Sequence, residues 1–268
     1  MIPMSEHPPE NPVSENPGLR SAATLIVARD TSDGAPDFLM IERSQTMAFA
    51  GGAMVFPGGA VDAADREYAR TLDKAADHDD LAARIAAIRE AIEECGLALG
   101  LSGGSSNPEA VDAMRAALKS GRTFAAIADE MALALDYDQL VPFTRWCPPG
   151  DAVHKRFDTR FYITRWDSDE GLLSPDGSET AGLGWYRARD MLAEADAGRA
   201  KIIFPTRRNL ERLAQFDSVG ALLDHARSFS PKLISPWVER RDGVDHLCIP
   251  DDAGYPVTSE PLTSAARG

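Results

Sequence analysis

The stretch from Leu81 to Gly100, LAARIAAIREAIEECGLALG, constrains the fold more than any other part of the chain. Its apolar residues recur at helical spacing, which predicts an amphipathic helix with one narrow apolar stripe toward the core: Leu81, Ile85, Ile88 and Ile92. The opposite side carries Glu90, Glu93 and Glu94, and the stretch contains no lysine. Small residues lie just upstream on that acidic side, so another segment could approach it closely: Ala83, Ala86 and Ala87.

The three glutamates are crowded enough to need a counter-charge. Glu90 and Glu94 are at i and i+4, where two like charges on a helix cost about 0.2–0.5 kcal/mol. They also lie near the helix C-terminus, where the macrodipole disfavours negative charge. A solvated surface is the ordinary interpretation of such acids, but Arg89 alone does not balance three carboxylates. A hard divalent cation such as Mg²⁺, which takes oxygen ligands and keeps waters for a substrate phosphate, explains the cluster better.

The net charge limits the possible partners, and the cysteine content limits the possible disulfides and metal sites. The chain has 268 residues and a formal net charge of −14, so a nucleic-acid backbone and an anionic membrane surface should both repel it. Three widely separated cysteines fit neither a disulfide framework nor a paired-cysteine zinc site: Cys95, Cys147 and Cys248. The sequence has no apolar run of membrane-spanning length and no charged-then-apolar leader, so we expect a soluble cytoplasmic protein.

Turn-rich and polar stretches divide the chain into three parts. Residues 1–17, rich in Pro, Glu and Asn, are expected to form a disordered tail. Strand-like and helical stretches over residues 18–210 predict an α/β or α+β domain. Within this domain we expect a polar insertion at about 66–78 and additional helices at about 107–135. Residues 211–268 are expected to form a helical and hairpin extension.

Two stretches resemble a known motif. REAIEECGL, from Arg89 to Leu97, resembles the second half of the Nudix box, G-x5-E-x7-R-E-U-x-E-E-x-G-U, in which U is apolar. FPGGAVDAAD, from Phe56 to Asp65, is similar to the first half, with Gly59 at the glycine position. The chain therefore resembles the Nudix hydrolase superfamily.

The box is interrupted, which bears on the branch of the family. Thirty positions separate Gly59 from Arg89, whereas the usual pattern spans fourteen. The mid-box acid is Asp65 when counted forward from Gly59, but counting back from Arg89 gives Leu81, and both assignments stay open. An interrupted box resembles the coenzyme A and acyl-coenzyme A diphosphatase-like branch, the nudix nineteen type.

Two further stretches are similar to that branch. MIERSQTMAFAGGAMVFPGG resembles its coenzyme A signature, but Ala48 stands where a second arginine is expected. TRWCPPGDAVHKRFDTRFYI resembles a W-x-x-P…R-F-D-T-x-F-F segment. The aromatic residues in this region are interpreted as core residues in preference to base-stacking groups: Phe143, Trp146 and Phe161.

The resemblance implies a fold and a site. The expected fold is an α/β/α sandwich with a mixed sheet, plus extra helices inserted after the box helix. Mg²⁺ or Mn²⁺ would be held by carboxylates and one backbone carbonyl: Glu90, Glu93, Glu94, the carbonyl of Gly59, and Glu179 from a distant loop. Arg89 would orient a glutamate, and Glu90 or Glu179 would be the base. The substrate would contact Arg43, Arg156 and Gly58.

Three functions are compatible with these residues. The first is hydrolysis of the diphosphate linkage of coenzyme A or acyl-coenzyme A, giving 3′,5′-ADP and (acyl-)4′-phosphopantetheine. The second is the same chemistry on ADP-ribose or a dinucleotide, and the third is a Nudix-fold module that binds a nucleotide without cutting it. We favour catalysis because all three glutamates and Arg89 are present. The expected partner is a small nucleotide, and the helices at 107–135 could form a lid or a homodimer surface.

Overall fold

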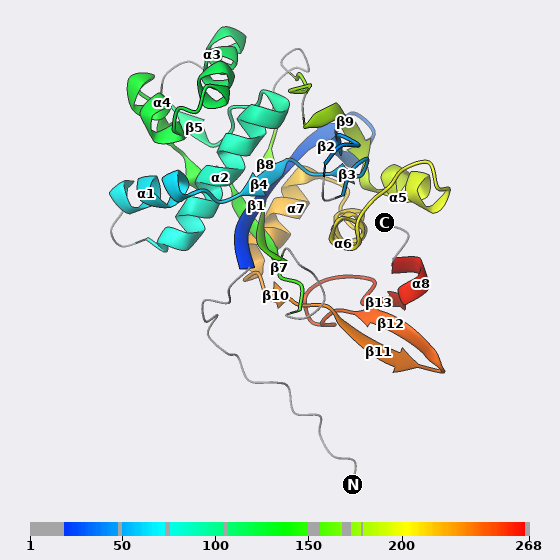
Figure 1. Ribbon diagram of the computed structural model, residues 1–268. Coiled ribbons are helices and arrows are strands. Elements are labelled where there is room, and N and C mark those ends of the chain that lie inside the picture. Colours follow the sequence, from blue (N-terminus) through cyan, green and yellow to red (C-terminus); the bar gives the residue numbers. More distant parts are fainter. Residues whose placement is uncertain are drawn as a thin grey trace.

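The computed structural model describes most of the chain (Figure 1). The described residues are 19–47, 50–72, 76–103, 107–149, 156–167, 173–177 and 179–265. The expected disordered tail at 1–17 and the position of Ala48 lie outside them.

A mixed sheet forms the centre of the fold. Among the described residues it contains eight strands, six of them in the order β10 (Leu233–Ile234), β7 (Val141–Trp146), β8 (Arg156–Arg165), β1 (Leu19–Thr31), β2 (Gly34–Arg43) and β3 (Met54–Val55). Off this path, β4 (Gly58–Ala60) pairs with β1, and β9 (Thr180–Arg187) pairs with β2. β1 runs parallel to β8 and antiparallel to β2 and β4. Successive side chains of β1 enter opposite cores, Leu25 and Val27 on one side and Ile26 and Ala28 on the other.

Helices cover both faces of the sheet. One face is covered by α2 (His78–Cys95), and α1 (Ala63–Leu72), α3 (Pro108–Lys119) and α4 (Phe124–Glu130) complete the core around this helix. The other packs against α5 (Ala188–Asp196), α6 (Phe204–Leu213) and α7 (Val219–Ser228). The expected α/β/α sandwich with a mixed sheet is therefore confirmed, and Figure 1 shows α2 and α7 on opposite sides of β1.

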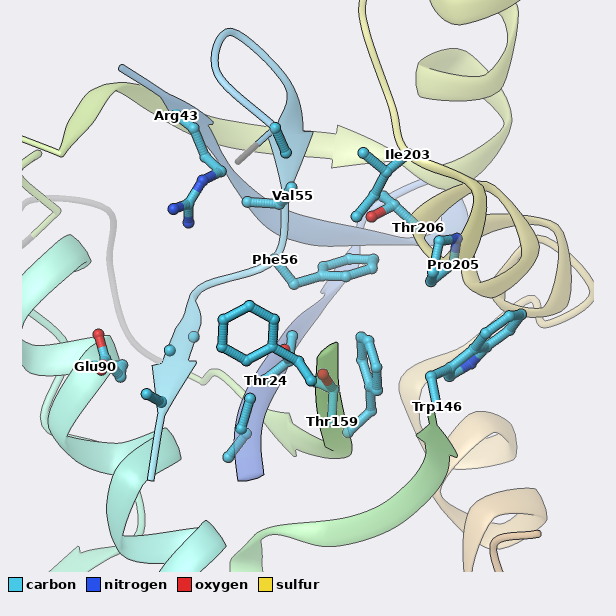
Figure 2. Close-up of a pocket in the computed structure, with 18 of the residues that line it drawn as sticks. Thr24, Arg43, Val55, Phe56, Glu90, Trp146, Thr159, Ile203, Pro205 and Thr206 are labelled. Atoms are coloured by element: carbon cyan, nitrogen blue, oxygen red, sulfur yellow. The ribbon is translucent and has the colours of Figure 1, made fainter. Parts of the chain in front are cut away.

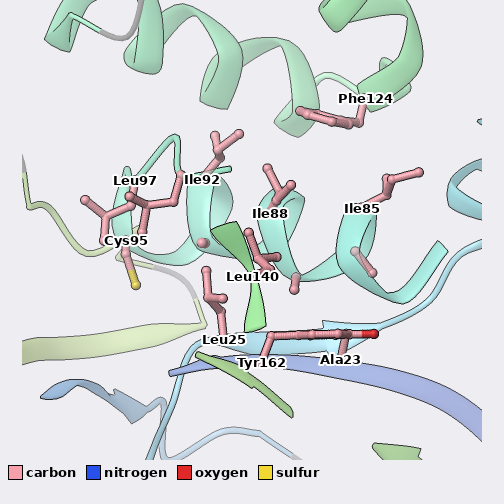
Figure 3. Packing of buried hydrophobic residues seen from close by; sticks show 14 of the residues in the cluster. Ala23, Leu25, Ile85, Ile88, Ile92, Cys95, Leu97, Phe124, Leu140 and Tyr162 are labelled. Atoms are coloured by element: carbon pink, nitrogen blue, oxygen red, sulfur yellow. The ribbon is translucent and has the colours of Figure 1, made fainter. Parts of the chain in front are cut away.

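The acidic helix α2 is buried on more sides than its sequence suggests. It begins after Asp77, whose side chain caps the helix by accepting hydrogen bonds from the backbone N–H groups of Asp79 and Asp80. Gly96 ends the helix in the left-handed conformation, with φ of 70°. The expectation of a narrow apolar stripe was wrong, since the alanines between the isoleucines are also buried. The reason is that α2 lies between the sheet and the α3–α4 pair, as Figure 3 shows for Leu25 below it and Phe124 above it.

The two expected insertions are helical. α1 occupies the first and packs against α2, with Ala69 fully buried. α3 and α4 occupy the second, between the short strands β5 (Leu101–Ser102) and β6 (Ala134–Leu135), which pair with each other. A 3₁₀ turn at Tyr137–Gln139 then leads into β7. These additions complete the core around α2 and leave its acidic side facing β4.

The C-terminal part adds a helix and an edge strand to the central sheet and forms a second, smaller sheet. α7 packs on the sheet, and β10 pairs with β7 at the sheet edge. A second sheet contains β11 (Trp237–Arg241), β12 (Val244–Cys248) and β13 (Ser259–Pro261), and the short α8 (Leu262–Ala265) follows. In this extension the tight hairpin turn joins β11 to β12, whereas residues 249–258 form a longer connection between β12 and β13. That connection buries Ile249, Ala253 and Tyr255 in the core.

Cysteines and helices match the sequence expectations where the structure describes them. Cys95, Cys147 and Cys248 are free and buried. Among the described residues, the helices are too short or too polar to cross a membrane.

Candidate active site

The two halves of the interrupted box meet at a glycine pair. Gly58 and Gly59 in β4 pair with Thr24 and Ala23 of β1. A Cβ atom at Gly58 would lie 2.3 Å from the backbone oxygen of Ala23, so this position has no room for a side chain. A Cβ at Gly59 would lie 2.3 Å from Glu90 Oε1. The two glycines thus allow β4 to lie directly against the acidic side of α2, and Gly59 and Glu90 are neighbours despite the insertion.

Two glutamates of α2 lie at this contact, Glu94 buried and Glu90 half-buried. The backbone N–H of Gly58 donates to Glu94 Oε2 at 2.8 Å, and Glu94 is 5% exposed. Burial raises the pKa of Glu94 to about 8, with a further contribution from the charge of Glu90. Burial likewise raises the pKa of Glu90 to about 7, although the charge of Arg89 opposes the shift. Without a cation, the pair therefore retains protons near neutral pH, because its surroundings do not compensate two negative charges.

The Arg89 side chain forms hydrogen bonds with three acidic residues of the site, Asp65, Glu90 and Glu93. Its guanidinium donates to both carboxylate oxygens of Asp65, Nε to Oδ1 at 3.2 Å and Nη2 to Oδ2 at 3.0 Å. Nη1 donates to Glu90 Oε1 at 2.9 Å and to Glu93 Oε2 at 2.8 Å. Burial alone would lower the pKa of Arg89, but the hydrogen bonds and charges of Asp65, Glu90 and Glu93 outweigh it and raise that pKa.

This geometry resolves the ambiguous count through the box. Asp65 is only 2% exposed and is the bidentate partner of Arg89, so it occupies the mid-box acid position that counting forward from Gly59 indicated. Leu81, the alternative, is a buried core residue. The inserted residues therefore follow the mid-box acid and leave the first half of the box intact.

A cavity of about 580 Å³ opens beside the glycine pair (Figure 2). Six of the residues predicted from the sequence line it: Arg43, Gly58, Gly59, Glu90, Glu94 and Glu179. Three others do not belong to its described lining: Arg89, Glu93 and Arg156. In Figure 2, Glu90 and Arg43 lie on one side of the cavity, whereas Trp146, Ile203 and Pro205 lie on the other.

The end of β2 brings Arg43 and Glu179 to the acidic side of the cavity. Arg43 pairs with Thr180, and the Ser44 backbone N–H donates to the Glu179 carbonyl at 2.7 Å. Their charges act on Glu94 in opposite directions, since Arg43 lowers its pKa and Glu179 raises it. Glu179 is exposed, so its carboxylate is accessible from the cavity mouth.

Arg156 does not belong to the described lining of the cavity, although it bonds the lining residue Pro148, and a different arginine lines the cavity. The Arg156 guanidinium donates to the carbonyl of Pro148, with Nη2 at 3.2 Å. Arg20, on β1 opposite Phe157, is exposed and lines the cavity. Sequence reasoning missed Arg20 because it precedes the apolar core of the strand. The only available signal was the strand period, which places it on the same face as Ala22 and Thr24.

Two of the three aromatic residues considered in the sequence belong both to the core and to the cavity lining. Phe143 is a core residue, as interpreted from the sequence, and is 1% exposed. Trp146 and Phe161 belong to the same core but also line the cavity. The interpretation of these two as core residues alone was therefore incomplete.

The raised pKa values predict how the stability of the metal-free protein depends on pH. Acids with a raised folded-state pKa stabilise the fold below their unfolded-state value of 4.5 and lose that contribution as pH rises through about 7 for Glu90 and about 8 for Glu94. In EDTA the melting temperature should therefore fall between pH 6 and pH 9. Glu94→Gln should reduce this fall, by a free energy on the order of a few kcal/mol at pH 9. Equal falls in both proteins would contradict the burial of an ionised Glu94.

Known proteins resemble this chain over most of its length, although no protein-family model matches it. It is 29% identical over 239 residues to "Putative nudix hydrolase 7" of Caenorhabditis elegans, covering 88% of this chain and 74% of that protein. It is 24% identical over 309 residues to acyl-coenzyme A diphosphatase NUDT19 of Xenopus laevis, covering 88% and 81%.

One solved structure is similar to this chain in both fold and sequence. The NUDIX hydrolase from Alicyclobacillus acidocaldarius superposes with a TM-score of 0.66 and is 30% identical, covering 77% of this chain and 96% of that one. The chain thus belongs to the Nudix hydrolases and is an enzyme of that superfamily.

Proposed function

We propose that this hydrolase cleaves a diphosphate linkage in a nucleotide derivative with the help of Mg²⁺ or Mn²⁺. One observation carries the proposal: the carboxylates of buried Glu94 and half-buried Glu90 meet the Gly58–Gly59 pair at one end of a cavity of about 580 Å³. Such a cavity is large enough for a small organic ligand.

The donor set fits a hard divalent cation. Carboxylate and carbonyl oxygens are the ligands that Mg²⁺ and Mn²⁺ prefer. A cation would favour the ionised forms of Glu90 and Glu94, whose pKa values are raised by burial and further by neighbouring carboxylates. Among the described residues, no three acidic, histidine or cysteine side chains already converge as ligands. The reason is that Arg89 holds Glu90 and Glu93, while the Gly58 N–H holds Glu94.

The residues that would hold the ion are those expected from the resemblance: Glu90, Glu93, Glu94, the Gly59 carbonyl and Glu179. When bound, the ion would neutralise the diphosphate oxygens and favour ionisation of a water. In the same site Arg89 holds Glu90 Oε1, and among the described contacts Glu90 Oε2 accepts no hydrogen bond. Oε2 is therefore the atom proposed to take a proton from the attacking water, with Glu179 as the alternative base.

For the substrate we propose coenzyme A or acyl-coenzyme A, hydrolysed to 3′,5′-ADP and (acyl-)4′-phosphopantetheine. Support comes from the signature before FPGG and from the likeness to the Xenopus laevis acyl-coenzyme A diphosphatase. Arg20 and Arg43 in the cavity lining would meet the anionic groups of such a substrate. Diphosphate hydrolysis of ADP-ribose or a dinucleotide is the second candidate, because the same carboxylate end would serve it. A non-catalytic nucleotide-binding module is the third.

A substrate screen tests the proposal. The protein would be incubated with Mg²⁺, with Mn²⁺ and with EDTA, and with coenzyme A, an acyl-coenzyme A, ADP-ribose, NADH and a diadenosine polyphosphate. We expect metal-dependent release of 3′,5′-ADP from the coenzyme A substrates and no turnover in EDTA. Faster cleavage of ADP-ribose would favour the second candidate. Tight binding without turnover of any substrate would favour the third.

Arginine variants test which arginine side chain binds the 3′-phosphate of coenzyme A. Replacing Arg20 or Arg43 with Ala should lower kcat/KM for coenzyme A more than for dephospho-coenzyme A, by about tenfold, the scale of one charge-assisted hydrogen bond. Arg156→Ala distinguishes the sequence proposal from the cavity lining, because Arg156 contacts the Pro148 carbonyl. Arg227→Ala, on the exposed side of α7, is the control. Equal losses on both substrates would show that the replaced arginine does not contact the 3′-phosphate.

A further inference from the structure

The floor of the cavity is a cross-strand row that leads away from the carboxylates. Ala60 of β4 pairs with Ala22 of β1, Ala22 with Thr159 of β8, and Thr159 with Trp146 of β7, and all four line the cavity. Neighbouring strands lie about 4.8 Å apart, so the three steps place Trp146 about 14 Å from Ala60. Ala60 follows Gly59, which contacts Glu90. A diphosphate held at the carboxylate end would therefore leave the far end for the rest of its substrate.

The far end has aromatic and apolar walls. The residues that form it come from five separate segments of the chain: Phe56, Trp146, Phe157, Phe161, Ile203, Pro205 and Pro236. Figure 2 shows Trp146 and Pro205 across the cavity from Glu90. Rings and prolines of this kind accept an uncharged planar group or an apolar chain.

The indole of Trp146 is fixed by a hydrogen bond to a residue far away in sequence. Trp146 Nε1 donates to the hydroxyl of Tyr255 at 3.0 Å across 109 positions of the chain. That hydroxyl also donates to Asn209 Oδ1 at 2.8 Å. Since its single hydrogen points to Asn209, the Thr144 hydroxyl, at 2.9 Å, is the donor in the third contact. The Tyr255 oxygen is thus a buried acceptor for both Trp146 and Thr144.

Aromatic and cation–π contacts fix the position of the Tyr255 ring. Its ring stands edge-to-face on Trp146, with centroids 5.7 Å apart and planes at 85°. The Arg212 guanidinium carbon lies 5.3 Å from the Tyr255 centroid and 4.1 Å from that of Phe143. Arg212 Nη1 donates to the Phe143 carbonyl at 3.2 Å, which anchors the cation to the sheet. Phe204 contacts the other side of the indole edge-to-face at 6.0 Å.

We propose that Tyr255, from the C-terminal connection between β12 and β13, positions Trp146 as the wall of a subsite for the uncharged planar or apolar part of the substrate beyond the diphosphate. This inference rests on the proposed function for the identity of the other end of the cavity. Tyr255 is 6% exposed and does not line the cavity, so it acts through Trp146. The C-terminal segment therefore contributes to substrate recognition without touching the substrate.

Removing the Tyr255 hydroxyl tests the proposal. Tyr255→Phe keeps the ring but leaves the Trp146 N–H buried without its acceptor, so the indole should shift or move more freely. For the best substrate of the screen, KM should rise about tenfold while kcat changes less than about threefold. The matched control is Tyr162→Phe, which removes a buried hydroxyl bonded to Asp80 on the opposite face of the sheet. An unchanged KM in Tyr255→Phe, or an equal rise in the control, would overturn the proposal.

A double-mutant cycle separates positioning from general destabilisation. In a Trp146→Phe background the N–H group is gone, so adding Tyr255→Phe should change KM less than about twofold. The emission spectrum should also change in Tyr255→Phe because Trp146 is one of four tryptophans and loses its hydrogen bond. An additive effect on KM in the cycle would overturn the positioning role.

Binding without metal distinguishes this inference from the proposed function. Coenzyme A and AMP would be titrated in EDTA while tryptophan fluorescence is followed in the wild type, Tyr255→Phe and Tyr162→Phe. Weaker binding in Tyr255→Phe alone supports the subsite even if the screen finds no hydrolysis, in which case only the proposed function fails. Equal affinities in all three proteins, together with normal hydrolysis, would reject the subsite and retain the function.

Discussion

Replacing Glu94 with Gln should lower kcat at least about 100-fold, the scale of losing one positioned electrostatic or acid–base group. Glu94 is 5% exposed and accepts the Gly58 N–H at 2.8 Å, so its carboxylate is held at the glycine pair. The amide oxygen of Gln can still accept that hydrogen bond, whereas the charge needed for a divalent cation is lost. Steady-state kinetics with Mg²⁺ and with Mn²⁺ would measure the loss.

The fold should survive this substitution, which makes the kinetic result interpretable. Gln is neutral, so the variant relieves the repulsion between Glu90 and Glu94 and should melt no lower than wild type in EDTA at pH 8. Glu130→Gln is the control because Glu130, at the end of α4, forms an exposed ion pair with Arg122, and exposed pairs contribute little to stability. Wild-type turnover in Glu94→Gln would refute the proposed metal site.

The parts of this site that the sequence predicted are those fixed by local spacing. The helical period places Glu90, Glu93 and Glu94 on one side of α2, and the letters FPGG place Gly58 and Gly59 side by side at the start of β4. Each of these features depends on residues that are close together in the sequence, so a local sequence pattern predicts it. The α/β/α fold followed from the resemblance for the same reason.

Contacts between distant segments were not predictable from one sequence. Asp65 could not be chosen over Leu81 because the insertion removed the spacing that identifies it, and only its bidentate contact with Arg89 decides the matter. Sheet register brings Arg20 to the cavity, and long-range packing brings Tyr255 to the cavity residue Trp146; neither leaves a local signature. Arg156 shows the converse, since its motif suggested a substrate contact while its guanidinium binds the Pro148 carbonyl.

The buried pair of Arg89 and Asp65 should dominate the stability of the site. Arg89→Met leaves Asp65, 2% exposed, as an uncompensated buried charge, and it also removes the donor to the Ala60 carbonyl. Breaking one side of such a pair costs about 3–5 kcal/mol, which for a chain of this size lowers the melting temperature on the order of 10 °C. Thermal and urea unfolding of the metal-free variant would measure this cost.

A second substitution shows whether the buried charge is the cause. Asp65→Asn removes the charge but can keep the hydrogen bond that Asp65 Oδ2 accepts from the Asp62 N–H. If the unpaired carboxylate is responsible, the double variant of Arg89→Met and Asp65→Asn should be more stable than Arg89→Met alone. Arg122→Met, at the exposed pair with Glu130, makes the same chemical change and should cost less than about 1 kcal/mol. A double variant no more stable than Arg89→Met would mean that lost packing of the arginine stem, and not the carboxylate of Asp65, carries the effect.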